Sequence, residues 1–240
     1  MISAELYKLR TQRTPMVCAA LLLVGVLASP AVLLFYTPAD PAAYSVAFTT
    51  TFQLLAPLVA IVFGGWLLGT EYRQGTVKRL LTGEPRRMRA FATKASVGAA
   101  ALITATGIAG VIGWTASWAV GSLNDQTVAW NGRELLAAGL VALAAGAVAY
   151  GLSAITRSDS FAMVGTVALV LVLDPLLSLI PKVGKYSFGT ALDTLTNEVA
   201  NTADLFGPAA LSLGTAGITL TLWLVAFVGS GSYLFARRDV

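Results

Sequence analysis

The sequence predicts an all-α membrane protein with six transmembrane helices, and three observations support this fold class. Apolar residues make up 56% of the chain and charged residues only 12%, which is too little charge to cover the surface of a soluble domain. The mean hydropathy is +0.75. Apolar runs that can cross a hydrocarbon core of about 30 Å recur along all 240 residues. They follow one another so closely that we expect a single transmembrane domain over residues 1–240.

The expected transmembrane helices are separated by short polar segments. They cover residues 16–36, 46–69, 95–121, 135–155, 161–180 and 208–236. The first follows three basic residues, as the core of a cleaved signal peptide does, but its length of about 20 residues favours an uncleaved span. In the fifth, Asp174-Pro175 predicts that the helix restarts, with Asp174 as the N-cap and Pro175 at the first helical position.

Basic residues are distributed unequally between the two sides of the membrane. If the N-terminus lies inside, thirteen of the sixteen fall on the cytoplasmic side, namely Lys8, Arg10, Arg13, Arg73, Lys78, Arg79, Arg86, Arg87, Arg89, Lys94, Arg157, Arg237 and Arg238. Only Arg133, Lys182 and Lys185 fall on the opposite side. This asymmetry predicts a multi-pass protein of the cytoplasmic membrane with both termini in the cytoplasm. The net charge of +4 is then explained by basic residues that mark the cytoplasmic side of the membrane. We therefore expect no nucleic-acid partner.

Several classes of site are disfavoured by composition. Cys18 is the single cysteine and the chain has no histidine, which excludes an intrachain disulfide and disfavours zinc and haem. No pair of acids, Ser-Lys dyad or cysteine-based site converges within the spans, so a membrane-embedded enzyme is the least favoured class. We expect no cofactor on this chain.

Residues 2–14 precede the first span and predict an amphipathic helix in the membrane interface. Ile2, Leu6 and Leu9 recur at helical spacing, while Glu5 and Lys8 lie elsewhere around the helix. We expect the apolar stripe to face lipid and the basic residues to face lipid phosphates. The alternative is a charged tail that only sets the orientation of the chain.

Residues 70–94 form the most charged stretch of the chain and predict a cytoplasmic loop that contains a short helix. Gly75 is expected to end the helical extension of the second span, and Pro85 suits the first turn of the helix that leads into the third. Between them, an apolar triplet is expected on one helical face with two basic residues beside it: Val77, Leu80 and Leu81, then Lys78 and Arg79. Such a helix is suited to dock a soluble partner. The alternative is a positive-inside loop without a partner, which explains the arginines but not the apolar triplet.

Residues 182–207 lie between the last two spans on the outer side. Leu192, Leu195 and Val199 have helical spacing there, which predicts at least one short external helix. Within the spans, we interpret three polar side chains as candidates for lining a transport path. Thr50 and Gln53 lie in the outer half of the second span, where Gln53 is the stronger candidate because a threonine hydroxyl can bond a carbonyl one turn back. Asp174 is a third candidate, with a helix-capping role and a proton-relay role both open.

Taken together, these features resemble the membrane subunits of the type-2 ABC exporter family along nearly the whole chain. The most specific segment is Glu71-x-x-x-Gly75-Thr76-x-x-x-Leu80-Leu81 with the following Pro85, Arg87 and Lys94, which is similar to the family's coupling-helix pattern. The ending Phe235-Ala236-Arg237-Arg238-Asp239-Val240 also resembles family members.

The resemblance implies a division of labour. The chain has no Gly-x-x-x-x-Gly-Lys-Ser/Thr phosphate loop, so ATP and Mg would be bound by a separate ATPase subunit, present in two copies beside a second membrane subunit. The implied ATPase-coupling residues are Glu71, Arg73, Gly75, Thr76, Val77, Lys78, Arg79, Leu80 and Leu81. Glu71 is expected to pair with Arg73, Lys78 or Arg79 as an exposed ion pair. Two alternatives remain, an ion-gradient-driven secondary transporter with inverted halves and a non-transporting scaffold or sensor.

Overall fold

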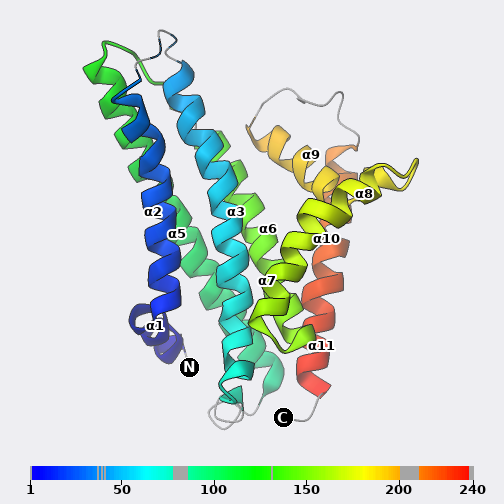
Figure 1. The fold of residues 1–240 in the computed structure, drawn as a ribbon. Coiled ribbons are helices and arrows are strands. Elements are labelled where there is room, and N and C mark those ends of the chain that lie inside the picture. Colours follow the sequence, from blue (N-terminus) through cyan, green and yellow to red (C-terminus); the bar gives the residue numbers. More distant parts are fainter. Residues whose placement is uncertain are drawn as a thin grey trace.

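The computed structural model describes residues 2–36, 38, 40, 42–77, 86–130, 132–200 and 211–237, and within these ranges every regular element is a helix (Figure 1). The first four long elements are α2 (Arg13–Leu33), α3 (Ala42–Arg73), α5 (Arg87–Leu123) and α6 (Gly132–Thr156). The fifth is composite, with α7 (Asp159–Ala168), a π-helix η1 (Leu169–Leu173) and α8 (Asp174–Ser178). The sixth comprises α10 (Leu213–Leu224), a π-helix η3 (Val225–Gly229) and α11 (Ser230–Arg237). Shorter elements are α1 (Ile2–Thr11), η2 (Gly184–Tyr186) and α9 (Phe188–Ala200).

Among the described residues, six helical elements are long and apolar enough to cross a membrane, which agrees with the predicted number of spans. Several extend further than predicted at the end of the bundle where the chain begins and ends. α3 continues to Arg73 and α5 already begins at Arg87, so both ends of the predicted loop 70–94 are helical. Hydropathy marks where the apolar residues stop, whereas a helix continues for as long as its backbone hydrogen bonds and side-chain partners support it.

The centre of the bundle is the pair α3 and α6, which pack closely because small residues face one another. A Cβ atom on Gly64 would lie 2.2 Å from the carbonyl oxygen of Gly146, so only glycine allows this approach. Ala60 and Ala142 are fully buried at the same contact surface. Small residues at a helix crossing allow the van der Waals contact that drives association in lipid.

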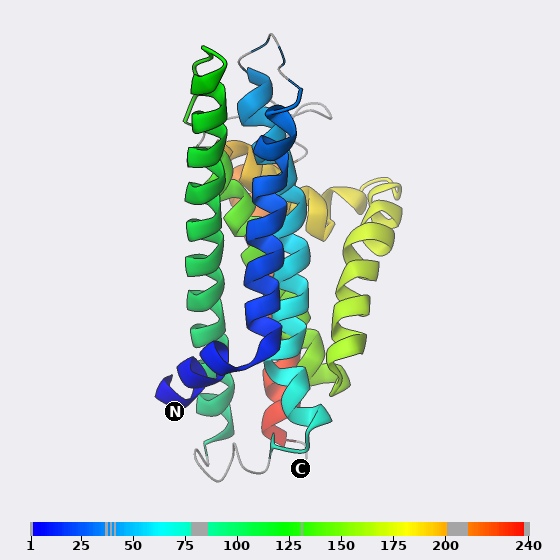
Figure 2. The ribbon, with the colours of Figure 1, turned by 60° about the vertical axis from the view of Figure 1, so that its left-hand side comes forward.

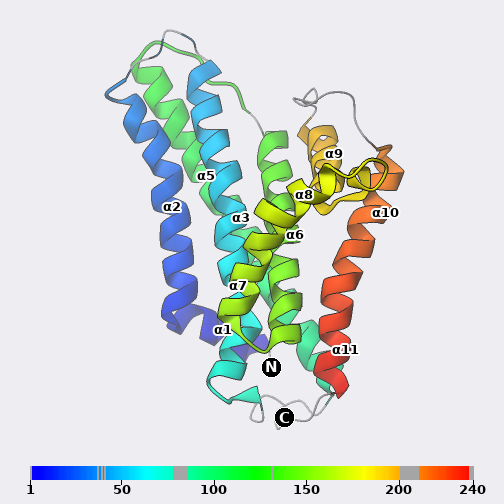
Figure 3. The same cartoon turned by 45° about the vertical axis from the view of Figure 1, so that its right-hand side comes forward.

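The other spans are arranged on either side of this central pair. α2 and α5 cover one side, while α7 and α10–α11 cover the other (Figures 1 and 3). α9 packs across α6 and α10 at the end opposite the termini, where Phe188 and Leu192 are buried beside Leu169 and Leu220. The predicted helix in segment 182–207 is therefore present as α9.

The fifth span does not restart at Asp174 as predicted. Asp174 has helical dihedral angles (φ −65°, ψ −48°), and the chain runs from α7 through η1 into α8 without a cap. The π-helix ends directly before Asp174-Pro175. A proline ring clashes with the carbonyl four residues earlier, here Leu171, and the wider π-turns accommodate this position without ending the helix.

Both chain termini lie at the same end of the bundle, together with α1, the last turn of α3 and the start of α5 (Figure 1). α8 and α9 lie at the opposite end. α1 crosses α5 near this terminal end (Figure 2). Because both termini lie at one end of the bundle, the chain passes along the bundle an even number of times, as six spans require.

Candidate functional site: a buried charge cluster at the end of α3

α3 ends in a glycine-dependent turn, as the sequence predicts. Gly75 has φ +64°, in the left-handed region that favours glycine. The amide of Thr76 donates to the carbonyl of Glu71 at 2.9 Å, and the amide of Gly75 donates to that of Tyr72 at 3.2 Å. These two bonds form a Schellman motif. The motif fixes the direction of the chain after Arg73 and brings the Thr76 hydroxyl back to Glu71.

Glu71 is the centre of a buried charge cluster that joins three helices. Its carboxylate accepts hydrogen bonds from the ammonium groups of Lys8 on α1 and Lys94 on α5, the latter at 3.1 Å, and from the Thr76 hydroxyl. Lys94 also lies 2.9 and 3.0 Å from the two carboxylate oxygens of Glu5 on α1. We call Glu5, Lys8, Glu71 and Lys94 the four-charge cluster. Its two carboxylates and two ammonium groups balance one another.

Burial makes this cluster dependent on all four members. The Lys94 side chain is 0% exposed, and those of Glu5 and Glu71 are 9% and 11% exposed. Lys8 lies 5.4 Å from the centroid of the Trp66 ring. Burial, together with repulsion from Lys94, lowers the pKa of the Lys8 ammonium. Removal of one member would leave a buried charge without compensation, which costs about 3–5 kcal/mol.

A second ion pair connects the end of α3 to the fifth span. Arg73 Nη1 lies 2.9 Å from Asp159 Oδ2 at the start of α7. Asp159 is buried, and Gly69 allows the close approach, because a Cβ there would lie 2.5 Å from the Asp159 Cα. The last turn of α3 therefore contacts α1, α5 and α7 through charged side chains.

An aromatic group lies beside the cluster in the same core and joins the sixth span to it. The rings of Phe91 and Tyr150 lie 4.7 Å apart, and those of Phe91 and Phe235 lie 5.8 Å apart. The Tyr150 hydroxyl donates to the Phe91 carbonyl at 2.9 Å. Phe235 thus secures the C-terminal helix α11 against α5 and α6.

Val77 is buried within this chain. Its side chain is 1% exposed and belongs to the same core as Trp66 and Phe91. Val77 is therefore not available on an exposed apolar face, contrary to its expected place in the triplet. Lys78, Arg79, Leu80 and Leu81 lie outside the described residues.

The three expected path residues have different surroundings. Thr50 and Gln53 are both exposed on one face of α3, and neither has a hydrogen bond to the described part of the chain. Thr49 and Thr51 instead bond carbonyls one turn back, at 3.0 and 2.8 Å. Asp174 accepts a hydrogen bond from the Gly189 amide at 2.8 Å, so its carboxylate caps the start of α9 rather than its own helix.

Comparison with known families decides the class of protein. The family of ABC-2 transporter proteins matches residues 2–240. The chain belongs to the ABC-2 transporter family. It is thus the membrane component of an ABC transporter, in which the ATPase is a separate subunit. No curated protein sequence matches the chain. Among the residues that the structure describes, no group of three His, Cys, Asp or Glu could bind a metal ion in this ABC-2 protein.

The cluster corrects two sequence expectations for this ABC-2 chain. Glu71 is buried and bonds Lys8 and Lys94 rather than forming an exposed pair, and Arg73 bonds Asp159 instead. On α1, Ile2 and Leu6 remain exposed as expected, but Lys8 turns into the protein rather than toward lipid phosphates. Lys8 turns inward because Glu71 on α3 and Lys94 on α5 are buried inside the bundle and require charged partners there.

Sequence reasoning missed the partners of Glu71, although a signal was present. Lys94 is a single charge inside the helical run that continues from Phe91 into apolar sequence, and a charge in such a place requires a partner. Glu5 and Lys8 are three residues apart and therefore lie on one face of α1. The sequence offers both signs of charge, but nothing in it specifies that α1 packs against α5.

Proposed function

We propose that this chain is the transmembrane subunit of an ATP-driven exporter, which moves its substrate by alternating access in a complex with two ATPase subunits and a second membrane subunit. The observation that carries the proposal is the position of Glu71. It connects the end of α3 to α1 and α5 directly before the segment that resembles a coupling helix. A force applied by an ATPase to that segment would reach α1, α5 and, through Arg73 and Asp159, α7.

The orientation proposed for the complex puts the terminal end of the bundle in the cytoplasm. The described basic residues gather at this end in space as they do in the sequence, whereas Arg133, Lys182 and Lys185 belong to the elements and turns of the opposite end. The positive-inside rule then favours a cytoplasmic four-charge cluster. An ATPase, which is a cytoplasmic subunit, meets the chain at this end.

Docking is proposed for the segment after Gly75. Leu80 and Leu81 would insert into the ATPase surface, with Lys78 and Arg79 beside them, while Val77 anchors the segment in the membrane subunit. Burying each leucine would contribute roughly 1.5 kcal/mol or more.

The substitution Leu80→Asp tests the docking proposal. We expect the ATPase to be lost from the detergent-purified complex, because a buried carboxylate without a partner costs several kcal/mol. Membrane insertion of the chain should be unchanged. Thr127→Asp, an exposed site at the opposite end, is the matched control and should retain the ATPase. Wild-type stoichiometry of the ATPase with Leu80→Asp would exclude this docking element, and a wild-type chain that co-purifies no ATPase would contradict the exporter proposal.

A further inference from the structure

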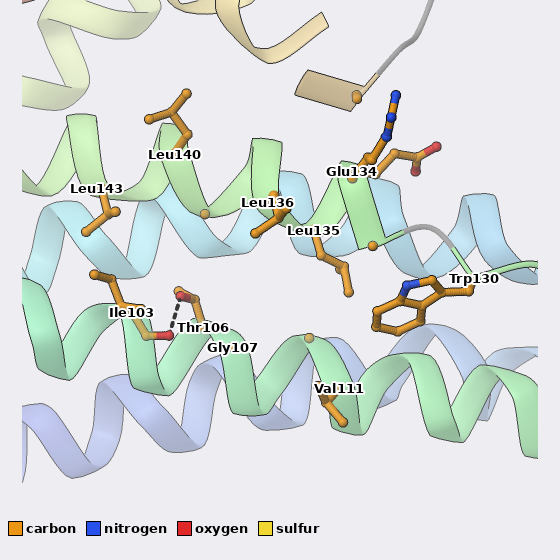
Figure 4. Close-up of a pocket in the computed structure, with 15 residues that line it drawn as sticks. Ile103, Thr106, Gly107, Val111, Trp130, Glu134, Leu135, Leu136, Leu140 and Leu143 are labelled. Carbon is orange, nitrogen blue, oxygen red and sulfur yellow. Dashed lines mark hydrogen bonds between the residues drawn. The ribbon is translucent and has the colours of Figure 1, made fainter. Parts of the chain in front are cut away.

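A groove lies between α5 and α6 (Figure 4), and no member of the four-charge cluster lines it. Its cavity volume is about 950 Å³, which is in the range of small-molecule sites. Ile103 of α5 lies opposite Leu143 of α6, and Leu135 of α6 points toward α5. Trp130 lies at one end of the groove, and Glu134 lies at the same end, with its side chain on the side of α6 that faces away from α5. Apart from Thr106 on α5, the walls are thus apolar, and the charged groups are concentrated at a single end.

The length of the groove corresponds to one leaflet of a bilayer. On α5 it extends from Ile103 to Val111, and on α6 from Leu143 back to Gly132. At 1.5 Å per residue these stretches measure roughly 12 and 16 Å. Half of a hydrocarbon core is about 15 Å. A hydrocarbon chain that enters the groove at the Trp130 end would therefore reach the midplane of the membrane.

Two glycines keep the groove open. A Cβ atom added to Gly107 or to Gly139 would meet no atom within 4 Å. Glycine in the middle of a helix is unfavourable for stability, and neither position is explained by a close helix contact. Thr106, on the α5 wall, donates its hydroxyl to the carbonyl of Leu102 at 2.8 Å, so it is satisfied within its own helix. The space suits an apolar chain.

The polar end has the character of a membrane interface. The rings of Trp114 and Trp130 lie edge to face, 4.6 Å apart, and tryptophans favour the head-group level of a bilayer. Arg133 and Glu134 follow in the first turn of α6, and Arg133 is exposed. Neither charge has an ion pair with another residue of the described chain.

We propose that this groove binds one phospholipid, with an acyl chain between α5 and α6 and the phosphate against Arg133. The start of α6 adds backbone N–H groups that favour an anion. Glu134 accepts an ammonium group, so a zwitterionic head group of the phosphatidylethanolamine type fits both charges. The inference requires only that α5 and α6 cross the membrane, and it is independent of the proposed exporter function. In the proposed orientation the lipid belongs to the outer leaflet.

Native mass spectrometry of the full chain, purified from phosphatidylethanolamine nanodiscs, tests the proposal. The wild-type chain should retain one phosphatidylethanolamine. Gly139→Leu fills the groove and should abolish retention. Gly217→Leu is the matched control, because a Cβ at that position of α10 also meets no atom within 4 Å, and it should retain the lipid. Gly107→Leu repeats the test from the opposite wall if Gly139→Leu does not fold.

The head-group contact is tested separately with Arg133→Gln. Loss of a charge-assisted hydrogen bond should weaken phosphatidylethanolamine binding about tenfold, toward the affinity for diacylglycerol, which lacks the phosphate. Retention by a folded Gly139→Leu or Gly107→Leu variant equal to the wild type would overturn the site. Equal loss in Gly217→Leu would also overturn it, because the retained lipid would then belong to the general lipid shell.

Discussion

Lys94 and Glu5 are 89 positions apart in the chain, yet the Lys94 ammonium lies 2.9 and 3.0 Å from the two carboxylate oxygens of Glu5. Both residues are buried. The contact attaches the N-terminal helix α1 to the start of the third span and completes the charge balance around Glu71. It follows that α1 is an integral part of the bundle at this end of the molecule.

Lys94→Met should destabilise the protein strongly. It leaves Glu5 and Glu71 buried with Lys8 as their remaining cation, so we expect a loss of about 3–5 kcal/mol in the free energy of unfolding. The measurement is denaturant unfolding in detergent. The double variant Glu5→Gln/Lys94→Met restores the charge balance and should recover a large part of the loss. Arg10→Gln, at an exposed position of α1, should change stability by less than about 0.5 kcal/mol.

Glu71→Gln should reduce both stability and coupling. The amide cannot neutralise Lys8 and Lys94, so we expect a loss well above the roughly 1 kcal/mol of an exposed pair. Hydrogen exchange of the α1 amides should increase, because two of the contacts of α1 depend on this cluster. An unchanged unfolding free energy combined with reduced ATPase stimulation would assign Glu71 to coupling alone.

Asp174 substitutions separate a helix cap from a proton relay. Asp174→Asn keeps an oxygen that can accept the Gly189 amide, so transport should continue and the protection of α9 against hydrogen exchange should change little. Asp174→Ala removes the acceptor and should destabilise α9 by about 0.5–2 kcal/mol. Equal loss of transport in both variants, without a change in α9, would favour the relay.

The orientation of the chain is tested by cysteine labelling in a Cys18→Ser background. Arg86→Cys and Ser160→Cys lie at exposed positions of the terminal end, and we expect them to be shielded from an impermeant thiol reagent in intact cells. Thr127→Cys and Glu198→Cys are exposed at the other end and should react. Labelling of Arg86→Cys from outside would reverse the orientation and remove the basis for ATPase docking.

Gln53→Leu tests whether the exposed polar face of α3 meets the second membrane subunit or the transport path. A side-chain hydrogen bond in a membrane contributes about 0.6–2 kcal/mol, so assembly or transport should weaken by a factor of about three to thirty. Thr51→Val is the control, because its hydroxyl bonds the Ala47 carbonyl within the same helix. If Gln53→Leu and Thr51→Val behave alike in both assays, the face has no such role.

The sequence by itself determined those features that depend on local physical chemistry. Hydropathy over about 20 residues is enough to specify a span, and the structure confirms six such helices. The end of the second span's helix at Gly75 and the helix in segment 182–207 were also predicted, because glycine conformation and helical periodicity act over a few residues. The family resemblance rested on the same local segments and is confirmed along residues 2–240.

Only the tertiary structure decided how the charges are paired. Glu71 has basic neighbours in sequence, yet its bonds go to Lys8 and Lys94, because α3, α1 and α5 converge where Glu71 and Lys94 are buried and Lys8 is partly buried. The sequence predicts Asp174 as the cap of its own helix. In the structure its carboxylate caps α9, because the fifth span brings it to the Gly189 amide. The sequence predicts Val77 as part of a docking face, but in the structure its side chain is buried in the core. A sequence records which residues carry charge, whereas their partners depend on which helices pack together, and burial makes those pairings energetically decisive.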